Sequence, residues 1–403
     1  MRIQDVTGDP KLMRQLNRSA VLGAIRREEP ISRARIARLL HLARPTVSEI
    51  VSELIDLGLV VETGQGESRV GRKPTLLELN IEDHLAVGLN LGVTQIEAAV
   101  VDLRGAVLAT ASVPTGASAG EAAVLERMKH TVSRVMSQSK QDKIVGLGVA
   151  VLGLVDDQTG INTLSTPLGW RNVPIKHMFQ DAFGLPTWVE NNANAMALGE
   201  KWFGCAKDVD GFVWIHVGTG VGAGIFLMGE LYRGEAGGAG EIGHTTVVPD
   251  GPLCTCGNRG CLTVLSAGPA IAERAKQMIT SDDETMLRNI PELTPEVVSW
   301  AANAGDGLAK KIIQDTGTYL GIGIANLINT FNLSTIILGG GVAKAGEIFL
   351  EAVRAAALKR AMAMPPHMIR ILPSSLGDDA GTIGAATVAF QGLFRSPESI
   401  LHK

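Results

Sequence analysis

Apolar residues recur at helical spacing in three stretches near the start of the chain. The first spans residues 11–28. Ser32 is suited to cap a second, short helix. A third helix is predicted over residues 45–57, because Pro45 suits a first helical turn and Gly58 suits the position after the last one.

Two short apolar runs, residues 59–62 and 75–79, follow these helices. Between them lies a glycine-rich segment, residues 63–74, that also carries basic side chains. Three helices followed by such a hairpin predict a winged helix-turn-helix domain over residues 1–82.

In such a domain the third helix enters the major groove of DNA and the hairpin, or wing, follows the backbone. The candidate DNA contacts are Ser32, Arg33, Arg44, Pro45, Thr46, Ser48, Glu49 and Ser52 in the helical part and Arg69, Arg72 and Lys73 in the wing. A small three-helix unit can also serve as a protein-interaction module, and this alternative stays open here.

From about residue 83 the pattern changes to strands that alternate with helices. A unit of two strands around a glycine turn, at residues 85–103, recurs at residues 212–226. The repeat predicts a duplicated α/β architecture with a cleft between two lobes. We expect the first lobe at residues 83–190, joined by a C-terminal helix at about 377–395, and the second lobe, with a dimerisation surface, at residues 191–376.

The charge distribution adds to this picture. The chain of 403 residues has a net charge of −4, yet residues 1–80 hold 13 Lys or Arg against 10 Asp or Glu. The basic excess therefore belongs to the N-terminal segment, as expected for a DNA-binding domain. We find no apolar run that fits a membrane span or a secretion signal, and we expect a cytoplasmic protein without a membrane partner.

Four cysteines in a cytoplasmic protein are not expected to form disulfides. Three of them join a histidine in the spacing H-x9-C-x-C-x4-C, which comprises His244, Cys254, Cys256 and Cys261. Three thiolates and one imidazole predict a closed, structural zinc site. The alternative is three buried thiols beside a core histidine. Cys205 lies outside the cluster and is interpreted as an inert thiol.

Asn191 and Asn192 stand where a predicted strand gives way to an alanine-rich helix. Carboxamides can bind a polyhydroxylated ligand, but at neutral pH they cannot take a proton from a hydroxyl group as a carboxylate can. Asn192 therefore decides between an enzyme and a sensor. Glu241, three residues before His244, is expected to be held by the zinc loop as an acceptor for ligand hydroxyls, with a surface salt bridge as the alternative.

These motifs resemble those of the ROK family, which comprises sugar-responsive bacterial repressors and sugar kinases on an actin/hexokinase-like fold. The resemblance rests on Glu190–Asn194, Gly218–Gly224, Gly240–His244 and Cys254–Cys261, together with the helix-turn-helix that only the repressor branch has. Four further segments, residues 64–66, 166–170, 199–201 and 372–376, are most similar to the xylose repressors.

The resemblance implies that Asn191, Asn192, Glu241, His244 and Thr263 line a sugar pocket and that His244 and the three cysteines hold zinc. Family kinases have a catalytic aspartate at the position of Asn192 and a second aspartate, in a phosphate-binding turn, at the position of Asn90. Both differences fall on groups that phosphoryl transfer needs, so we expect no kinase activity. Thr263 stands where the family usually has glutamate. The shorter threonine enlarges the pocket and can change the preferred sugar.

The sequence thus predicts a homodimeric repressor of carbohydrate uptake or catabolism genes. Its expected partners are double-stranded operator DNA, structural zinc and a sugar effector, xylose or another sugar. Two alternatives stay open: an ATP-dependent sugar kinase with a DNA-binding head, which the glycine turns would permit, and a regulator whose effector is a phosphotransferase-system protein.

Overall fold

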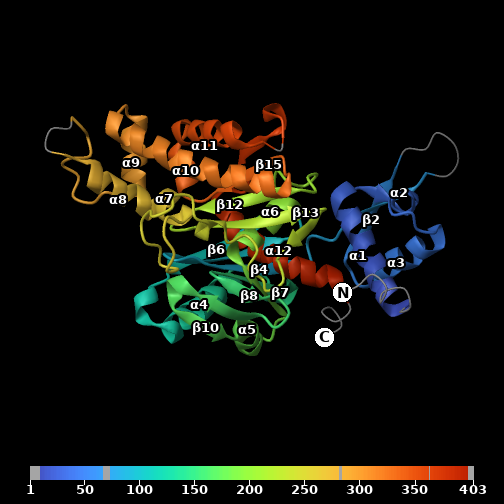
Figure 1. The fold of residues 1–403 in the computed structure, drawn as a ribbon. Coiled ribbons are helices and arrows are strands. Elements are labelled where there is room, and N and C mark those ends of the chain that lie inside the picture. The colour runs from blue at the N-terminus through green and yellow to red at the C-terminus, as the bar shows by residue number, and fades with distance from the viewer. Residues whose placement is uncertain (1–9, 67–72, 281–283, 363, 398–403) are drawn as a thin grey trace. The chain divides into compact units, whose positions relative to one another are not determined.

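The computed structural model describes residues 10–66, 73–280, 284–362 and 364–397 (Figure 1). Two of the predicted wing contacts, Arg69 and Arg72, lie outside the described residues. The chain divides into two compact units. Unit 1 comprises Met1–Ala150, Pro174–Glu190 and Ala385–Lys403, and unit 2 comprises Val151–Val173 and Asn191–Gly384. No helix in the described part is long and apolar enough to cross a membrane.

The N-terminal part of unit 1 is a winged helix-turn-helix, as predicted. It contains the helices α1 (Pro10–Glu28), α2 (Arg33–Leu39) and α3 (Arg44–Asp56) and a sheet of strands β1 (Ile31–Ser32), β3 (Thr75–Leu79) and β2 (Val60–Gln65), in that order. The apolar stripes predicted from the spacing form its core, where Ile25, Ile36 and Leu54 are fully buried. Helix α3 begins at Arg44, one residue before the predicted start.

The rest of unit 1 is built on a five-stranded sheet. Its order is β11 (Thr187–Asn191), β7 (Ile144–Val151), β4 (Leu85–Leu91), β5 (Gln95–Asp102) and β6 (Val107–Pro114), with helices α4 (Glu121–Met136), α5 (Ile175–Phe183) and α12 (Ala380–Arg395). All seven residues of β4 are buried, which explains why this strand is apolar almost throughout.

Unit 2 repeats this topology. Strands β12 (Phe212–Val217), β13 (Val221–Leu227) and β14 (Glu230–Tyr232) form an antiparallel meander, and β15 (Thr335–Gly339) and β16 (Arg370–Pro373) add parallel to its first strand. In unit 1, β4, β5 and β6 form the same meander, with β7 parallel to β4. The predicted duplication is therefore confirmed.

In the described residues of unit 2, the sheet is accompanied by the helices α6 (Asn192–Trp202), α7 (Leu262–Ser266), α8 (Gly268–Met278), α9 (Pro295–Asn303), α10 (Gly307–Phe331) and α11 (Glu347–Arg360). A small sheet of β8 (Leu154–Asp156), β9 (Ile161–Ser165) and β10 (Trp170–Val173) also belongs to this unit. The lobe boundaries predicted from the sequence place residues 151–173 in the first lobe. They group with unit 2 instead, where the backbone of Gly153 receives a hydrogen bond from Asn191.

Candidate functional site

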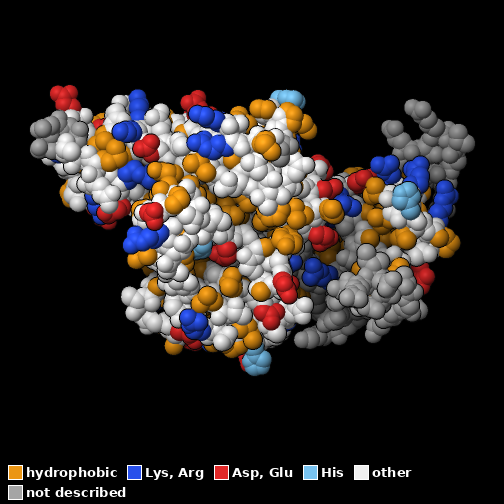
Figure 2. Space-filling view, in the orientation of Figure 1, with side chains coloured by type: hydrophobic (Ala, Val, Ile, Leu, Met, Phe, Trp, Pro, Cys, Tyr) orange, Lys and Arg blue, Asp and Glu red, His pale blue; other side chains and the backbone are white. Residues whose placement is uncertain are grey.

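Helix α3 presents the polar face that was predicted to meet DNA. Arg44, Pro45, Ser48, Glu49 and Ser52 are exposed and Thr46 is half-buried. The opposite face, with Val47, Ile50 and Val51, is buried against the rest of the domain. Figure 2 shows Lys and Arg side chains gathered on this N-terminal helical part.

Several of the predicted contacts already have partners inside the domain. Ser32 accepts a hydrogen bond from the backbone N–H of Arg35, 3.3 Å away, and so caps α2 as expected. Arg33 pairs with Glu62 at 2.8 Å, and Glu49 pairs with Arg14 of α1 at 2.9 Å. These three side chains therefore help to hold the helices and the wing in place.

Arg44 and Lys73 differ from that group. Both are exposed, and among the described residues no carboxylate lies within ion-pair distance of either cation. Ser48 accepts a hydrogen bond at its backbone carbonyl from the Ser52 hydroxyl, 3.0 Å away. The start of α3 and the base of the wing thus keep charged and hydroxyl groups that can reach a nucleic acid.

The predicted metal ligands come together in one loop of unit 2. Their ligand atoms, from His244, Cys254, Cys256 and Cys261, all lie within 4.8 Å of one another. Cys256 Sγ is 3.7 Å from Cys261 Sγ, and Cys254 Sγ is 3.5 Å from His244 Nδ1. A disulfide needs about 2.05 Å between sulfurs, so the thiols are not paired.

These separations suit a zinc ion. Tetrahedral coordination with Zn–S bonds of about 2.3 Å and Zn–N bonds of about 2.0 Å places two sulfurs about 3.8 Å apart and a sulfur and a nitrogen about 3.5 Å apart. Hydrogen bonding to the backbone of Asn258 lowers the pKa of Cys256 to about 7, whereas burial raises the pKa of Cys261 to about 12. A bound dication would favour the thiolate form of all three cysteines.

Glu241 lies beside this cluster. Its Oε2 is 3.9 Å from Nε2 of His244, the ring nitrogen on the side away from Cys254. The Glu241 side chain is 45% exposed. Nevertheless, loss of hydration raises the pKa of its carboxyl group, and His244 opposes that rise. One imidazole can therefore face a metal through Nδ1 and the carboxylate through Nε2.

The start of α6, with Asn192, and the turn that holds Glu241 both pack against strand β13. Ala193, near the start of α6, lies against Gly222 and Gly224 of this strand. Gly240 has a φ of +94°, and a Cβ atom there would lie 1.9 Å from the carbonyl oxygen of Ala223. Only glycine permits that approach, which brings the turn holding Glu241 onto β13.

Thr263 lies on the other side of the same turn. Its hydroxyl oxygen accepts a hydrogen bond of 3.4 Å from the backbone N–H of Val221, and it lies beside Gly243. Thr263 therefore lies beside Gly243, which belongs to the same short segment as Glu241 and His244, and its role in a sugar pocket stays a prediction. The threonine is half-buried and keeps a hydroxyl group where a longer acidic side chain would extend.

Asn191 caps helix α6. Its Oδ1 accepts hydrogen bonds from the backbone N–H groups of Ala193 and Asn194, at 2.8 and 3.2 Å, and its Nδ2 donates to the carbonyl of Gly153 at 2.9 Å. These bonds fix the strand-to-helix turn. The neighbouring Asn192, the first residue of the helix, is half-buried.

Asn90 lies in unit 1, at the end of β4. It is buried, and its Nδ2 donates a hydrogen bond of 3.2 Å to Glu97 of β5, the residue opposite it in the hairpin. An aspartate at this position would face the Glu97 carboxylate instead of donating to it. The amide therefore suits its surroundings better than an aspartate would.

The sequence reasoning missed a buried carboxylate. Glu200, at the end of α6, is fully buried and accepts hydrogen bonds from Ser374, Ser375, Leu376 and Cys205. It thereby ties α6 to the loop before α12. Residues 199–201 and 372–376 each carry a short motif in the sequence, but nothing in a linear pattern indicates that the two segments meet.

Comparison with known proteins places these features in context. The model of the ROK family matches residues 86–391, and that of the MarR family matches residues 15–69. The putative xylose repressor of Caldicellulosiruptor sp. (strain Rt8B.4) is 35% identical over 398 residues, which cover 98% of this chain and 100% of that relative.

Two solved structures are similar as well. One is a ROK family transcriptional regulator, described as a homologue of the Escherichia coli MLC protein, with a TM-score of 0.86, 29% identity and coverage of 97% of this chain and 100% of that one. The other is a ROK family glucokinase from Streptomyces griseus in complex with glucose and AMPPNP. Its TM-score is 0.71 at 33% identity, and the match covers 76% of this chain and 100% of the glucokinase chain.

Proposed function

Because the chain belongs to the ROK family, we propose that it is a sugar-responsive, DNA-binding transcriptional repressor. The observation that carries the proposal is the winged helix-turn-helix joined in one chain to the duplicated α/β domain. The regulators compared above match 97–98% of the chain, whereas the glucokinase structure covers 76% of it. A repressor of this kind acts on chromosomal DNA in the cytoplasm.

On this proposal, DNA is bound by α3 and the wing. Arg44, Thr46 and Ser48 are the candidates for base contacts, since they are accessible and not used to hold the domain together. Lys73, with Arg69 and Arg72, would neutralise phosphates. Ser32, Arg33 and Glu49 would act mainly by holding the reading helix in position, since each has an intramolecular partner.

The sugar would bind where the start of α6 and the turn at Glu241 both pack on β13. Asn192 offers a donor and an acceptor to ligand hydroxyls, and Glu241 offers an acceptor. His244 can donate from Nε2 while Nδ1 faces the metal. Asn191 is better suited to fix the geometry of the turn, and Thr263 would line the pocket next to Gly243.

We place a structural zinc ion on His244, Cys254, Cys256 and Cys261. Bound there, it would supply a cross-link rather than a reactive centre, because four protein ligands leave no open coordination position. The chain's own contribution is to hold the loop on β13 and to keep the Glu241 carboxylate beside His244. Loss of the ion would therefore release the carboxylate as well as the loop.

The proposal excludes phosphoryl transfer as the main activity. Asn192 cannot act as a general base at neutral pH, and Asn90 donates to Glu97 at the position of the second kinase aspartate. The competing reading, an ATP-dependent sugar kinase, predicts ADP formation with a pentose or hexose. Sustained turnover with any such sugar would overturn the sensor-only function.

Xylose is the first effector to test, because relatives across nearly the whole chain are named xylose repressors. Full-length protein would be mixed with DNA from the promoter next to its gene, and binding would be measured with and without xylose and other sugars. We expect one sugar to change DNA affinity at least tenfold. A response to a phosphotransferase-system protein, with none to any sugar, would favour that alternative effector.

Two sets of variants locate the sites. Arg44→Ala should weaken DNA binding by about 5- to 100-fold, the usual cost of a lost base or phosphate contact. Arg171→Ala, an exposed arginine in β10, serves as the matched control. Asn192→Ala should abolish the thermal stabilisation by sugar but leave DNA binding intact. If Arg171→Ala weakened binding as much as Arg44→Ala, the α3 assignment would be wrong.

A further inference from the structure

Helix α3, the reading helix of the DNA-binding domain, carries more acid than base. Its 13 residues include one basic side chain, Arg44, and three acidic side chains, Glu49, Glu53 and Asp56. DNA carries a dense row of phosphate charges on each strand, and a helix in the major groove lies between the two rows. Because both rows repel a negatively charged helix, the domain needs a way to cancel acidic charge on α3.

Two of these acids share one side of the helix. Glu49 and Glu53 lie four residues apart, a spacing at which like charges on a helix repel each other. At 100° per residue, Glu49 lies about 60° around the axis from the exposed Ser52. Glu49, 64% exposed, therefore belongs to the face proposed for DNA, and Glu53, 24% exposed, lies at the border of that face.

One guanidinium group, that of Arg14 in α1, contacts both acids. Its Nη2 atom donates a hydrogen bond of 2.9 Å to Oε1 of Glu49 and another hydrogen bond to Oε1 of Glu53. The second oxygen of Glu53 is buried and has no hydrogen-bond partner among the described residues. Water therefore screens the Glu53 carboxylate only in part, and Arg14 supplies a counter-charge that solvent does not.

Stability of the fold does not account for this contact. Arg14 is 51% exposed, and ion pairs at exposed positions add little to the free energy of unfolding. The apolar face of α3, with Val47, Val51 and Leu54, is buried and already holds the helix on the domain. The bridge from Arg14 therefore has a role besides holding α3 in place.

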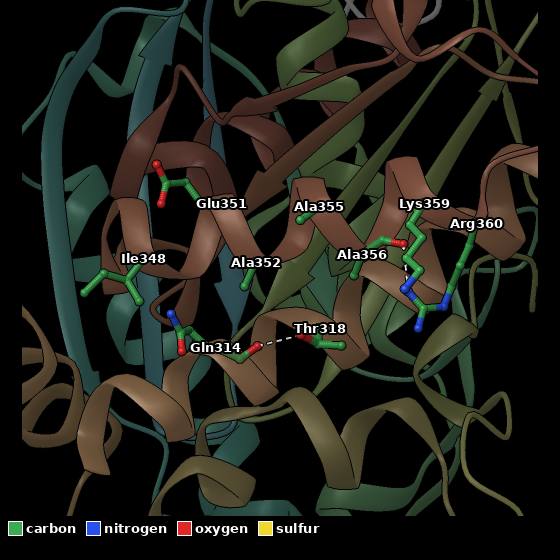
Figure 3. A pocket seen from close by; sticks show the side chains of 9 residues that line it. All are labelled: Gln314, Thr318, Ile348, Glu351, Ala352, Ala355, Ala356, Lys359 and Arg360. Atoms are coloured by element: carbon green, nitrogen blue, oxygen red, sulfur yellow. Dashed lines mark hydrogen bonds between the residues drawn. The ribbon is translucent and has the colours of Figure 1, made fainter. Parts of the chain in front are cut away.

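Helix α11 shows that a pair of acids at this spacing needs no bridge. Glu347 and Glu351 are also four residues apart, and Arg354 pairs with Glu347. Among the described residues, however, Glu351 has no cation within ion-pair distance. It lines a shallow groove to which the neighbouring helix α10 contributes the uncharged Gln314 and Thr318 (Figure 3). A bridging cation on α3 is thus a feature of the reading helix rather than a general need of acidic helices.

We propose that Arg14 is a positioning residue for DNA binding, which neutralises Glu49 and Glu53 and contacts no DNA itself. With both acids compensated, Arg44 and Ser48 of the same helix can approach the groove without repulsion from their neighbours. The inference rests on the proposed function, because it assumes that α3 enters the groove. Since a single nitrogen of Arg14 meets both acids, one positive charge at this place is sufficient.

The affinity of the full-length protein for DNA from the promoter next to its gene, measured by fluorescence anisotropy at fixed salt, tests the proposal. Arg14→Ala should raise the dissociation constant about tenfold, because two carboxylates near the phosphates lose their counter-charge. Arg14→Lys keeps the charge and should stay within about threefold of wild type. Arg171→Ala, which removes an exposed charge outside the DNA-binding domain, is the matched control and should change nothing.

Removal of the two acids separates neutralisation from a direct role of Arg14. In the background Glu49→Gln/Glu53→Gln no charge needs to be cancelled, so the addition of Arg14→Ala should raise the dissociation constant by less than about threefold. If Arg14 contacted a phosphate, or if its link between α1 and α3 were what positions the helix, the tenfold loss would persist in this background. That result would overturn the proposal.

Two further comparisons keep the test decisive. Should Arg14→Ala unfold in thermal melts, Arg14→Gln in the same two backgrounds gives the same comparison, because glutamine removes the charge but keeps a hydrogen-bonding group. Equal affinity of wild type and the Arg14 variants would overturn this inference alone. Failure of the wild-type protein to bind any DNA would overturn the repressor function as well, so the two failures are distinguishable.

Discussion

Glu200 offers the sharpest test of how unit 2 is held together. Its carboxylate is fully buried and accepts hydrogen bonds from the Ser374 hydroxyl at 2.6 Å, from the Ser375 backbone and hydroxyl at 2.8 Å each, and from the backbone of Cys205 at 2.9 Å and Leu376 at 3.3 Å. Substitution to glutamine keeps the size of the side chain. It removes the charge and replaces one acceptor oxygen by a donor.

The expected cost follows from that geometry. Backbone N–H groups face both carboxylate oxygens, so the new amide nitrogen must meet at least one donor in either orientation. A hydrogen bond to a charged group contributes about 1.5–3 kcal/mol, and a buried donor without a partner costs about 1–3 kcal/mol. Since hydroxyl groups can rotate to relieve part of this loss, we expect Glu200→Gln to destabilise the contact by about 3 kcal/mol.

Hydrogen exchange measures this effect locally. The amides of Ser375 and Leu376 should exchange about 100-fold faster in Glu200→Gln, because each 1.4 kcal/mol is a factor of ten. Glu230→Gln, which removes an exposed charge in β14, should change nothing. Equal protection of residues 374–376 in wild type and Glu200→Gln would refute the view that this carboxylate anchors the loop before α12.

Three further predictions concern the metal, acid stability and catalysis. Cys256→Ser should lose zinc, measured as metal content, together with the thermal shift caused by sugar, while Cys205→Ser, outside the cluster, should keep both. Burial lowers the pKa of His216 to about 4 from an ordinary 6.5. As the pH falls, His216 therefore takes up a proton in the unfolded chain before it does so in the folded chain. The free energy of unfolding should keep its full value above pH 6.5 and fall by up to about 3 kcal/mol towards pH 4. His216→Phe should remove that part of the acid sensitivity in melting curves taken across this pH range. Asn192→Asp alone should form no ADP with any sugar, and appreciable turnover would show that the phosphate side of the site is intact.

Much of the fold could be predicted because its signals are local. Helical spacing defined α1 and α3, and the repeated glycine hairpins indicated the duplication that the two sheet orders confirm. The metal cluster could be predicted equally well, because its four ligands lie within eighteen residues of the sequence and their types and spacing suit one ion. Local sequence carries such features because the chain has little freedom over short separations.

Features that depend on distant contacts could not be predicted in the same way. Glu200 meets Ser375 across 175 residues, and no periodicity relates the two. The grouping of residues 151–173 with unit 2 has the same origin. For Asn191 a signal did exist, since an asparagine between a strand and a helix is a favoured N-cap. The structure shows that its carbonyl oxygen accepts the capping bonds, and its role as a sugar contact stays a prediction.

The pairing of Asn90 with Glu97 changes the meaning of the substitution at Asn192. Had only Asn192 departed from the kinase pattern, one mutation could restore the missing base. Asn90 is buried and donates to Glu97 across the β4–β5 hairpin, so an aspartate there would place two carboxylates about one hydrogen bond apart. Such a pair repels unless one acid takes up a proton. We therefore expect that a phosphoryl-transfer activity would require changes at Asn90, Glu97 and Asn192 together.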